Sequence, residues 1–333
     1  GQRDAGWPVV VKVGGSPASR LHWFLLFSEG AFMADRFGNS CHQIPEGLPK
    51  LPVRIRESSK FDYGRVVLVA GSRGMAGAAA LSSMAALRGG AGLVEAIVPE
   101  SIQSTVAGFD PCVMTHGLPE DAAGRFSLSA LSAIHDRCQK ADVVALGPGL
   151  GRSDDLVKIV QDLWQTLPRP AVVDADALWA LAQDAEWQKF EHAGARVLTP
   201  HAGELVRLLG SSPSREKKQE RKELEAAASH LARATKSVVV FKGPASLITD
   251  GTTNIHNETG NPGMATAGTG DVLTGVLAAL LAQRLSAFDA ARLGTWIHGA
   301  AGADAVDRYG ECSLTARDLL RCLYTQTTRC LSK

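Results

Sequence analysis

The sequence contains few cysteines and almost no net charge. Its six cysteines show no C-x-x-C spacing and are too sparse for a disulfide scaffold, which argues against a zinc site and favours reduced thiols in a cytoplasm. The net charge of +1 gives no electrostatic signature of nucleic-acid or membrane binding. We therefore expect the partner to be a small molecule or another subunit.

Long hydrophobic runs are absent as well. The apolar run near the N-terminus, residues 21–27, is far too short to cross a bilayer. It also lacks the basic lead and the small-residue cleavage pattern of a signal peptide. From these absences we expect a cytoplasmic protein that neither enters a membrane nor is exported.

Glycine and small apolar residues are abundant. The 333 residues include 34 glycines, 45% are hydrophobic and only 6% are aromatic, as expected of an α/β protein with tight turns between strands and helices. A chain of this length and apolar content can bury a substantial core in one large or two ordinary domains. Disorder of the whole chain is therefore excluded.

One glycine-rich segment, residues 261–271, leads directly into an apolar run with helical spacing. Asp271 then falls in the first turn of a helix, and the amides of Gly268 to Gly270 point outward without partners. Such amides and the helix dipole form a site for a phosphate, while the carboxylate beside them can take a proton. The segment predicts phosphoryl chemistry; the alternative is an ordinary glycine-rich turn with an N-terminal aspartate.

Strands and helices alternate along most of the chain. The turn 71–77 lacks the spacing of a dinucleotide fingerprint and the lysine of a P-loop, so it identifies neither. The predicted parallel strands are 66–70, 93–98, 142–146, 171–173, 196–198 and 237–241, with an antiparallel addition at 247–256. We predict an α/β fold with a mostly parallel sheet, helices on both faces, and one domain over residues 56–327.

Polar residues follow several of these strands. The carboxyl ends of parallel strands meet at one edge of an open α/β sheet, where ligands bind. Asp174 and Asp176 could orient a metal-bound water or a substrate hydroxyl, although Asp176 equally fits the N-cap of the next helix. His201 either contacts a ligand or is structural, and Glu204 could simply complement a helix dipole. Lys242 can supply a point charge to a phosphate.

Residues 1–55 do not match the rest of the chain. Residues 9–16 resemble the opening of amino-acid kinases, with Lys12 before a glycine pair, but no second half of that fold follows. We interpret residues 1–55 as an extension, either a remnant, a mis-started segment or a loosely ordered arm. Residues 213–236 carry many charges and predict a helix with one solvated face, to which we assign no chemistry.

Several motifs follow one another along the chain: Gly71-Ser72, Gly77-Ala78-Ala79, Leu146-Gly147-Pro148-Gly149-Leu150-Gly151, Val173-Asp174-Ala175-Asp176-Ala177-Leu178, Thr199-Pro200-His201-x-Gly203-Glu204, Lys242-Gly243, Gly260 to Asp271, 298–302 and 314–319. Together they resemble one known family over about residues 55–325: the NAD(P)H-hydrate dehydratases of the YjeF C-terminal type, within the ribokinase-like fold. The epimerase domain often fused ahead of this type needs more than the leading fifty-odd residues, so we expect it to be absent.

The resemblance implies an enzyme that restores NADH and NADPH from their hydrated forms, using ADP or ATP to phosphorylate the hydroxyl of the hydrate. Asp271 would be the base, and Gly268 to Gly270 the anion hole for the phosphoryl group. Mg²⁺ is implied, without a choice among Asn261, Glu204 and Asp174 as ligands. The implied nucleotide-binding residues are Lys242, Gly243, Pro244, Ala245, Ser246 and Gly270. The implied substrate-binding residues are Ala78, Gly149, His201 and Asp271.

Two other functions remain open from the residues alone. A kinase of the same fold that acts on hydroxymethylpyrimidine or hydroxyethylthiazole would share the glycine-rich loop and its aspartate. A nucleotide-binding regulatory module without turnover is the third interpretation, but it would be free to lose Asp271, Lys242 and His201. The Asn-Pro-Gly-Met lead at 261–264 favours the dehydratase. The resemblance also implies a homo-oligomer.

Overall fold

The structure, a computed structural model, describes residues 43–211 and 220–331, which belong to one compact unit. Lys12 and most of the predicted extension lie outside the described residues. Residues 43–55 contact the domain that follows them. Leu51 is buried in its core, and the amide of Leu51 donates a hydrogen bond to the carbonyl of Cys330.

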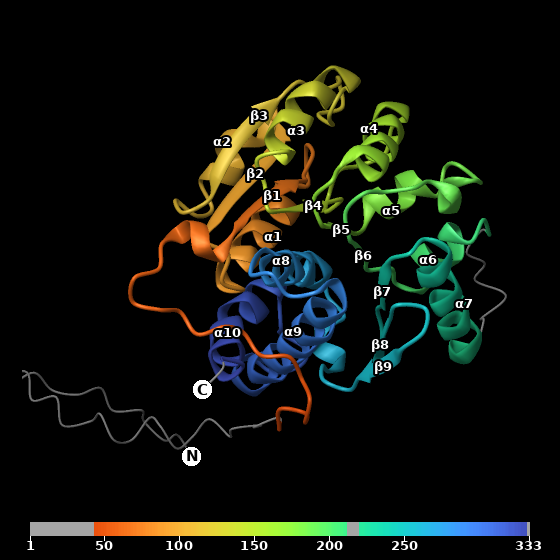
Figure 1. Ribbon diagram of the computed structural model, residues 1–333. Helices are drawn as coiled ribbons and strands as arrows, with labels where there is room; N and C mark the ends of the chain where they lie inside the picture. The colour runs from red at the N-terminus through yellow and green to blue at the C-terminus, as the bar shows by residue number, and fades with distance from the viewer. Residues whose placement is uncertain (1–42, 212–219, 332–333) are drawn as a thin grey trace, which may run out of the picture. The chain divides into compact units, whose positions relative to one another are not determined.

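A nine-stranded sheet is the centre of the described structure (Figure 1), in the order β3-β2-β1-β4-β5-β6-β7-β8-β9. The first seven strands are parallel, while β8 and β9 are antiparallel additions next to β7, which confirms the predicted mostly parallel sheet with an antiparallel addition. The strands are β1 (Arg65–Val69), β2 (Leu93–Pro99), β3 (Met114–Leu118), β4 (Val143–Leu146), β5 (Ala171–Val173), β6 (Arg196–Leu198), β7 (Val238–Phe241), β8 (Ser246–Thr249) and β9 (Asn254–Asn257).

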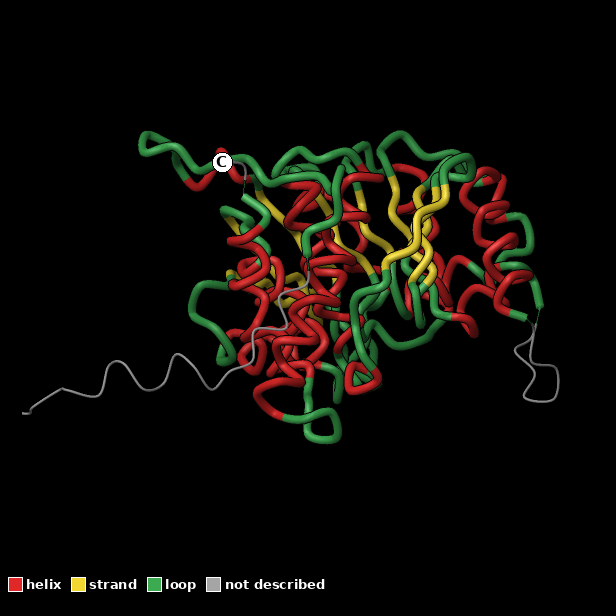
Figure 2. Tube along the Cα trace, turned by 90° about the horizontal axis from the view of Figure 1, so that it is seen from below, coloured by secondary structure: helices red, strands yellow, loops and turns green. Residues whose placement is uncertain are grey.

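Helices cover both faces of the sheet, so that the strands lie between helical layers (Figure 2). Alternation along β1 shows why: Val66 and Leu68 belong to one apolar core, while Val67 and Val69 belong to the other. The first core is closed by α1 (Ala76–Arg88), α2 (Gln103–Ala107), α8 (Thr269–Ala282), α9 (Ala287–Tyr309) and α10 (Ala316–Arg329). The second is closed by α3 (Leu131–Cys138), α4 (Asp154–Thr166), α5 (Asp176–Leu181), α6 (Ala202–Leu208) and α7 (Arg221–Ala234).

Helix α8 is buried on all sides from Val272 to Ala282. It lies beside α1 and α9 (Figure 1), and glycines permit the close approach. A Cβ at Gly275 would lie 2.1 Å from the carbonyl oxygen of Ser82 on α1, and one at Gly294 of α9 would lie 2.6 Å from Leu277. The glycine-rich segment that leads into α8 is therefore anchored at its end by a tightly packed helix.

Some elements between residues 99 and 166 were not predicted. Strand β3 lies at the edge of the sheet, and its residues are half-buried or exposed, so it lacks the apolar run of a central strand. Helices α3 and α4 pack on the second core. No helix in the described parts of the chain has both the length and the apolar character needed to span a membrane.

Candidate active site

The predicted site residues gather at the carboxyl edge of the sheet. Gly149 follows β4, Asp174 follows β5, His201 follows β6 and Lys242 follows β7, while the start of α8 brings Gly270 to the same edge. A Cβ at Gly270 would lie 3.6 Å from Lys242 Nζ and 3.8 Å from Asp174 Oδ2. Asp174 and Gly270, which are far apart in sequence, thus meet in one site.

The glycine-rich loop enters α8 through Gly268, whose φ of +90° is a conformation that favours glycine. No described residue accepts a hydrogen bond from the amides of Gly268, Thr269, Gly270 or Asp271. His298 Nε2 lies 2.8 Å from the carbonyl oxygen of Thr269, and burial lowers the pKa of His298 to about 4. The imidazole is therefore neutral and donates to this carbonyl, which fixes the first turn of α8, while the unpaired loop amides remain available to an anion.

Asp271 lies in the first turn of α8, as predicted. Burial raises its pKa from an ordinary 3.8 to about 7, the negative charges of Asp174 and Asp176 add to the rise, and the charge of Lys242 opposes it. A carboxylate with a pKa near 7 is well matched to taking a proton at neutral pH. The geometry places this base beside the free amides.

Asp174 and Lys242 form a buried ion pair. Lys242 Nζ lies 2.7 Å from Asp174 Oδ1 and 3.7 Å from Glu204 Oε2, while Thr274 Oγ1 donates to Asp174 Oδ2 at 2.7 Å. Burial raises the pKa of Asp174, but the charge of Lys242 and these hydrogen bonds outweigh it and hold the pKa below its usual value. Burial lowers the pKa of Lys242, and Asp174 and Glu204 reverse the shift. Both groups are therefore charged.

His201 and Glu204 cap helix α6 reciprocally. His201 Nδ1 accepts from the amides of Gly203 at 3.0 Å and Glu204 at 3.3 Å, and Glu204 Oε2 accepts from the amide of His201 at 2.8 Å. Both residues therefore have a structural role at the start of α6, which is one of the alternatives that the sequence left open. His201 Nε2 lies 3.5 Å from Glu204 Oε1, but the imidazole is 59% exposed and can therefore also meet a ligand.

The predicted substrate residues Ala78 and Gly149 lie against each other. A Cβ at Gly149 would lie 2.9 Å from the Cβ of Ala78. Asp176 is not the N-cap of α5, since that position belongs to Ala175; its Oδ2 instead accepts from the amide of Gly151 at 2.9 Å. Asp176 therefore ties the turns after β4 and β5 together.

The turn between β7 and β8 carries the predicted nucleotide residues Lys242 to Ser246. Gly243 has a φ of +144° and Ala245 a φ of +50°, conformations that cost an ordinary residue energy. Ser246 Oγ donates to the carbonyl of Gly243 at 3.0 Å and closes the turn. The turn is therefore already folded at the carboxyl edge of the sheet, next to Lys242.

The site does not offer a protein cage for a metal ion. Residues 43–211 and 220–331 hold no group of three or more His, Cys, Asp or Glu side chains arranged around one point. Asp174 and Glu204 already face Lys242 Nζ, and the side-chain amide of Asn261 is buried without a hydrogen-bond partner among the described residues. A Mg²⁺ ion at this site would therefore need ligands from outside these acidic and histidine side chains, such as phosphate oxygens and water.

Sequence reasoning missed three neighbours of the site: Thr274, His298 and Arg221. Thr274 has a signal, because it lies three residues after Asp271 on the same helix. His298 belongs to the motif 298–302, but nothing in the sequence pairs it with Thr269, 29 residues away, and Arg221 has no signal toward Ala245, 24 residues away. Only the fold brings them together.

The mostly parallel sheet with helices on both faces is that of the ribokinase-like class. Free amides at a helix start, a base with a pKa near 7 and a buried lysine at its carboxyl edge are features expected of a phosphoryl-transfer site. The profile of the NAD(P)H-hydrate dehydratase family matches residues 66–324 of the chain. The chain belongs to this family.

Known proteins agree with this assignment. The chain is 46% identical to the bifunctional NAD(P)H-hydrate repair enzyme of Moorella thermoacetica over 273 residues, which cover 81% of the chain and 50% of the relative. A ribokinase-like superfamily protein of Enterococcus faecalis matches with a TM-score of 0.71 and 25% identity, over 85% of the chain and 93% of that structure. The ADP/ATP-dependent NAD(P)H-hydrate dehydratase of Bacillus subtilis, co-crystallised with ATP/Mg²⁺, matches with a TM-score of 0.70 and 26% identity, over 86% and 99%.

The chain spans about half the length of the curated relatives it matches. A hydroxyethylthiazole kinase of Pyrococcus horikoshii matches with a TM-score of 0.51 and 16% identity, over 81% of the chain and 89% of the kinase, a likeness that shows the fold alone. The kinase alternative thus has the weaker support.

Proposed function

We propose that the chain catalyses the nucleoside-phosphate-dependent dehydration of hydrated NADH and NADPH, which restores the reduced cofactors. The proposal rests mainly on the position of Asp271, a base with a pKa of about 7 in the first turn of α8. Beside it lie backbone amides that donate no hydrogen bond to any described residue. Membership of the NAD(P)H-hydrate dehydratase family supplies the substrate.

In the first step Asp271 takes the proton of the hydroxyl of the hydrate, and the hydroxyl oxygen attacks the terminal phosphorus of ADP or ATP. The bond from this phosphorus to the nucleotide breaks, and AMP leaves when ADP is the donor. The amides of Gly268 and Gly270 donate to the phosphoryl oxygens as charge develops on them, and Lys242 adds positive charge.

In the second step the carbon–oxygen bond of the phosphorylated hydrate breaks. Phosphate leaves with the bonding electrons and with the former hydroxyl oxygen, and the ring loses a proton from the neighbouring carbon. The ring double bond returns, giving NADH or NADPH. The net change is loss of water at the expense of one phosphoric anhydride bond.

The two ligands approach from different strand ends. The turn Lys242-Gly243-Pro244-Ala245-Ser246, with Gly270, would bind the nucleotide, whose phosphates carry Mg²⁺. Ala78, Gly149 and His201 would hold the hydrated cofactor, with Asp271 between the two ligands. We further propose a cytoplasmic homo-oligomer, in line with the resemblance and with the metabolite on which it acts.

The test is to give the purified protein NADH hydrate with Mg²⁺ and either ADP or ATP. We expect the absorbance of reduced nicotinamide to return with one or both nucleotides and not without them. If neither nucleotide restores it, while hydroxyethylthiazole or hydroxymethylpyrimidine is phosphorylated, the chain is a vitamin-precursor kinase and the proposal is wrong.

A further inference from the structure

Arg221, in the first turn of α7, lies against the turn that carries the proposed nucleotide residues. Its guanidinium covers the ring of Phe241 at 4.1 Å, its Nη2 donates to the carbonyl of Ala245 at 3.1 Å, and its Nε donates to Glu225 Oε1 at 2.8 Å. Phe241 ends β7 directly before the turn, and Ala245 lies within it. Arg221 thus holds the turn at both ends.

The remaining nitrogen of this guanidinium, Nη1, lies over Gly243. A Cβ at Gly243 would lie 2.7 Å from Nη1, so glycine leaves just the room that the guanidinium needs. No described residue accepts a hydrogen bond from Nη1. The side chain is 34% exposed, which keeps this donor within reach of a ligand on the turn.

We propose that Arg221 sets the affinity of the site for the nucleotide: it holds the 243–246 turn in its binding conformation and donates from Nη1 to the bound nucleoside phosphate. This inference rests on the proposed function, which places the nucleotide on this turn. A planar guanidinium suits the role because its fixed fork can serve the carbonyl of Ala245 and a ligand oxygen together, whereas a lysine ammonium offers no such fork.

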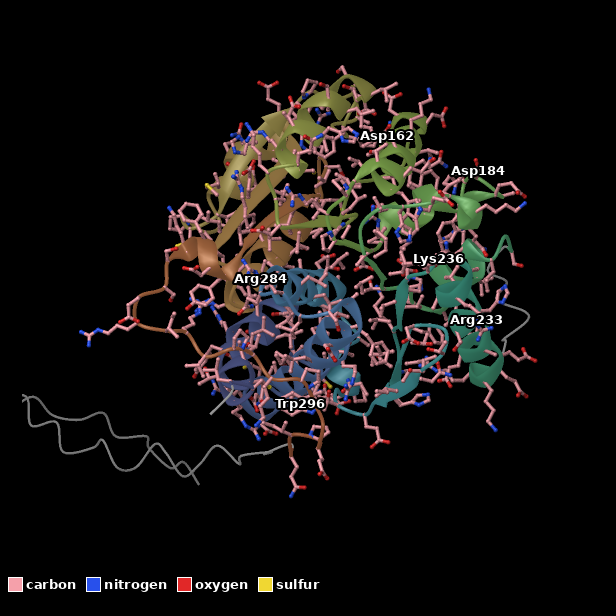
Figure 3. All side chains as sticks on the ribbon, viewed as in Figure 1. Asp162, Asp184, Arg233, Lys236, Arg284 and Trp296 are labelled. Atoms are coloured by element: carbon pink, nitrogen blue, oxygen red, sulfur yellow. The ribbon has the colours of Figure 1, made fainter. Side chains whose placement is uncertain are left out.

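Helix α7 also supplies a matched control. Arg233, in the last turn of the same helix (Figure 3), donates Nη2 to the carbonyl of Gly251 at 2.6 Å. A Cβ at Gly251 would lie 2.8 Å from Arg233, so this arginine also holds a glycine turn. That turn joins β8 to β9 and carries none of the proposed nucleotide residues. A purely structural role would give the two arginines similar effects.

The experiment compares Arg221→Met with Arg233→Met; methionine keeps an apolar stem of similar length. Nucleotide binding is measured by calorimetry with ADP and with ATP, and kcat and both KM values by the repair assay. For Arg221→Met we expect nucleotide affinity to fall, and the nucleotide KM to rise, by about tenfold or more, as for a lost charged hydrogen bond. The KM of the hydrated cofactor should stay unchanged, and Arg233→Met should bind nucleotide like the wild type.

A third variant, Arg221→Lys, keeps the charge and should still bind nucleotide about tenfold more weakly than the wild type, because the fork is lost. It carries the test alone if Arg221→Met does not fold. Nucleotide affinity within twofold of the wild type in a folded Arg221 variant overturns the inference while the proposed function stands. A wild-type protein that neither binds nucleotide nor restores NADH overturns both.

Discussion

Lys242 Nζ lies 2.7 Å from Asp174 Oδ1, so the cation expected to meet a phosphate is held by a carboxylate that is only 2% exposed. The pair fixes the position of the ammonium group, and its negative member raises the pKa of the nearby Asp271. Asp174 therefore does two things that the structure shows: it fixes the position of the Lys242 ammonium group, and its charge adds to the rise that burial causes in the pKa of Asp271.

Replacing Asp271 by Asn should abolish most of the turnover while nucleotide binding persists. Loss of a general base typically costs a factor of about 10²–10⁴ in rate. The measurement is kcat in the repair assay together with nucleotide affinity by calorimetry. Turnover near the wild-type value in a folded variant would show that another group takes the proton.

The rate should depend on the protonation of Asp271. Because its pKa is raised to about 7, kcat/KM should fall as pH drops below 7 and the carboxylate becomes protonated. Asp174→Asn removes a negative neighbour, so the pKa of Asp271 should fall and the acidic limb should move to lower pH. The test is the pH profile of both proteins.

The control for this profile is Asp62→Asn, which removes a carboxylate near the start of β1, outside the candidate site. Its acidic limb should coincide with that of the wild type. An acidic limb that stays in place in Asp174→Asn, or that moves equally in the control, would contradict the electrostatic coupling.

Gly270→Ala should reduce turnover without harming the fold. The added methyl would lie 3.6 Å from Lys242 Nζ, an ordinary contact, but it would occupy the space assigned to the phosphoryl group, so we expect turnover to fall at least about tenfold. Gly268→Ala should behave differently, because a φ of +90° costs alanine about 1–3 kcal/mol of stability. Thermal unfolding and kcat distinguish the two, and equal effects on both quantities would refute the assignment.

His298 should make stability depend on pH. Burial lowers its pKa from 6.5 to about 4, so between these values the unfolded chain binds a proton that the folded protein does not. The free energy of unfolding should therefore fall as pH drops from 6.5 to 4, by about 3 kcal/mol at most for this group. Denaturant unfolding measures it, and His298→Gln should lose this part of the slope. An identical slope in the variant would contradict the prediction.

Much of the fold could be predicted because apolar strands such as Val66–Val69 and Val238–Phe241 alternate with helices and glycine turns. The mostly parallel character of the sheet and the antiparallel addition at β8 and β9 followed from the same pattern, whereas the order of the strands was not predicted. Strand β3 could not be found in this way: as a partly exposed edge strand it carries no continuous apolar run.

The site was predictable where the chemistry is local. The glycine loop, Asp271 and the strand-end residues share a short motif or a strand end, so their meeting at one edge followed from topology. Contacts across the fold were not predictable, since nothing in the sequence pairs Lys242 with Asp174, 68 residues away, or Arg221 with Ala245. Such contacts depend on side-chain packing rather than on periodicity.

The most direct test of the central claim, phosphoryl transfer to the hydroxyl of the hydrate, uses NADH hydrate labelled with heavy oxygen in that hydroxyl. We predict that the label appears in the inorganic phosphate released with NADH, because the carbon–oxygen bond breaks after the oxygen has joined phosphorus. Label found in water, with unlabelled phosphate, would show that the nucleotide is hydrolysed separately and would contradict the account.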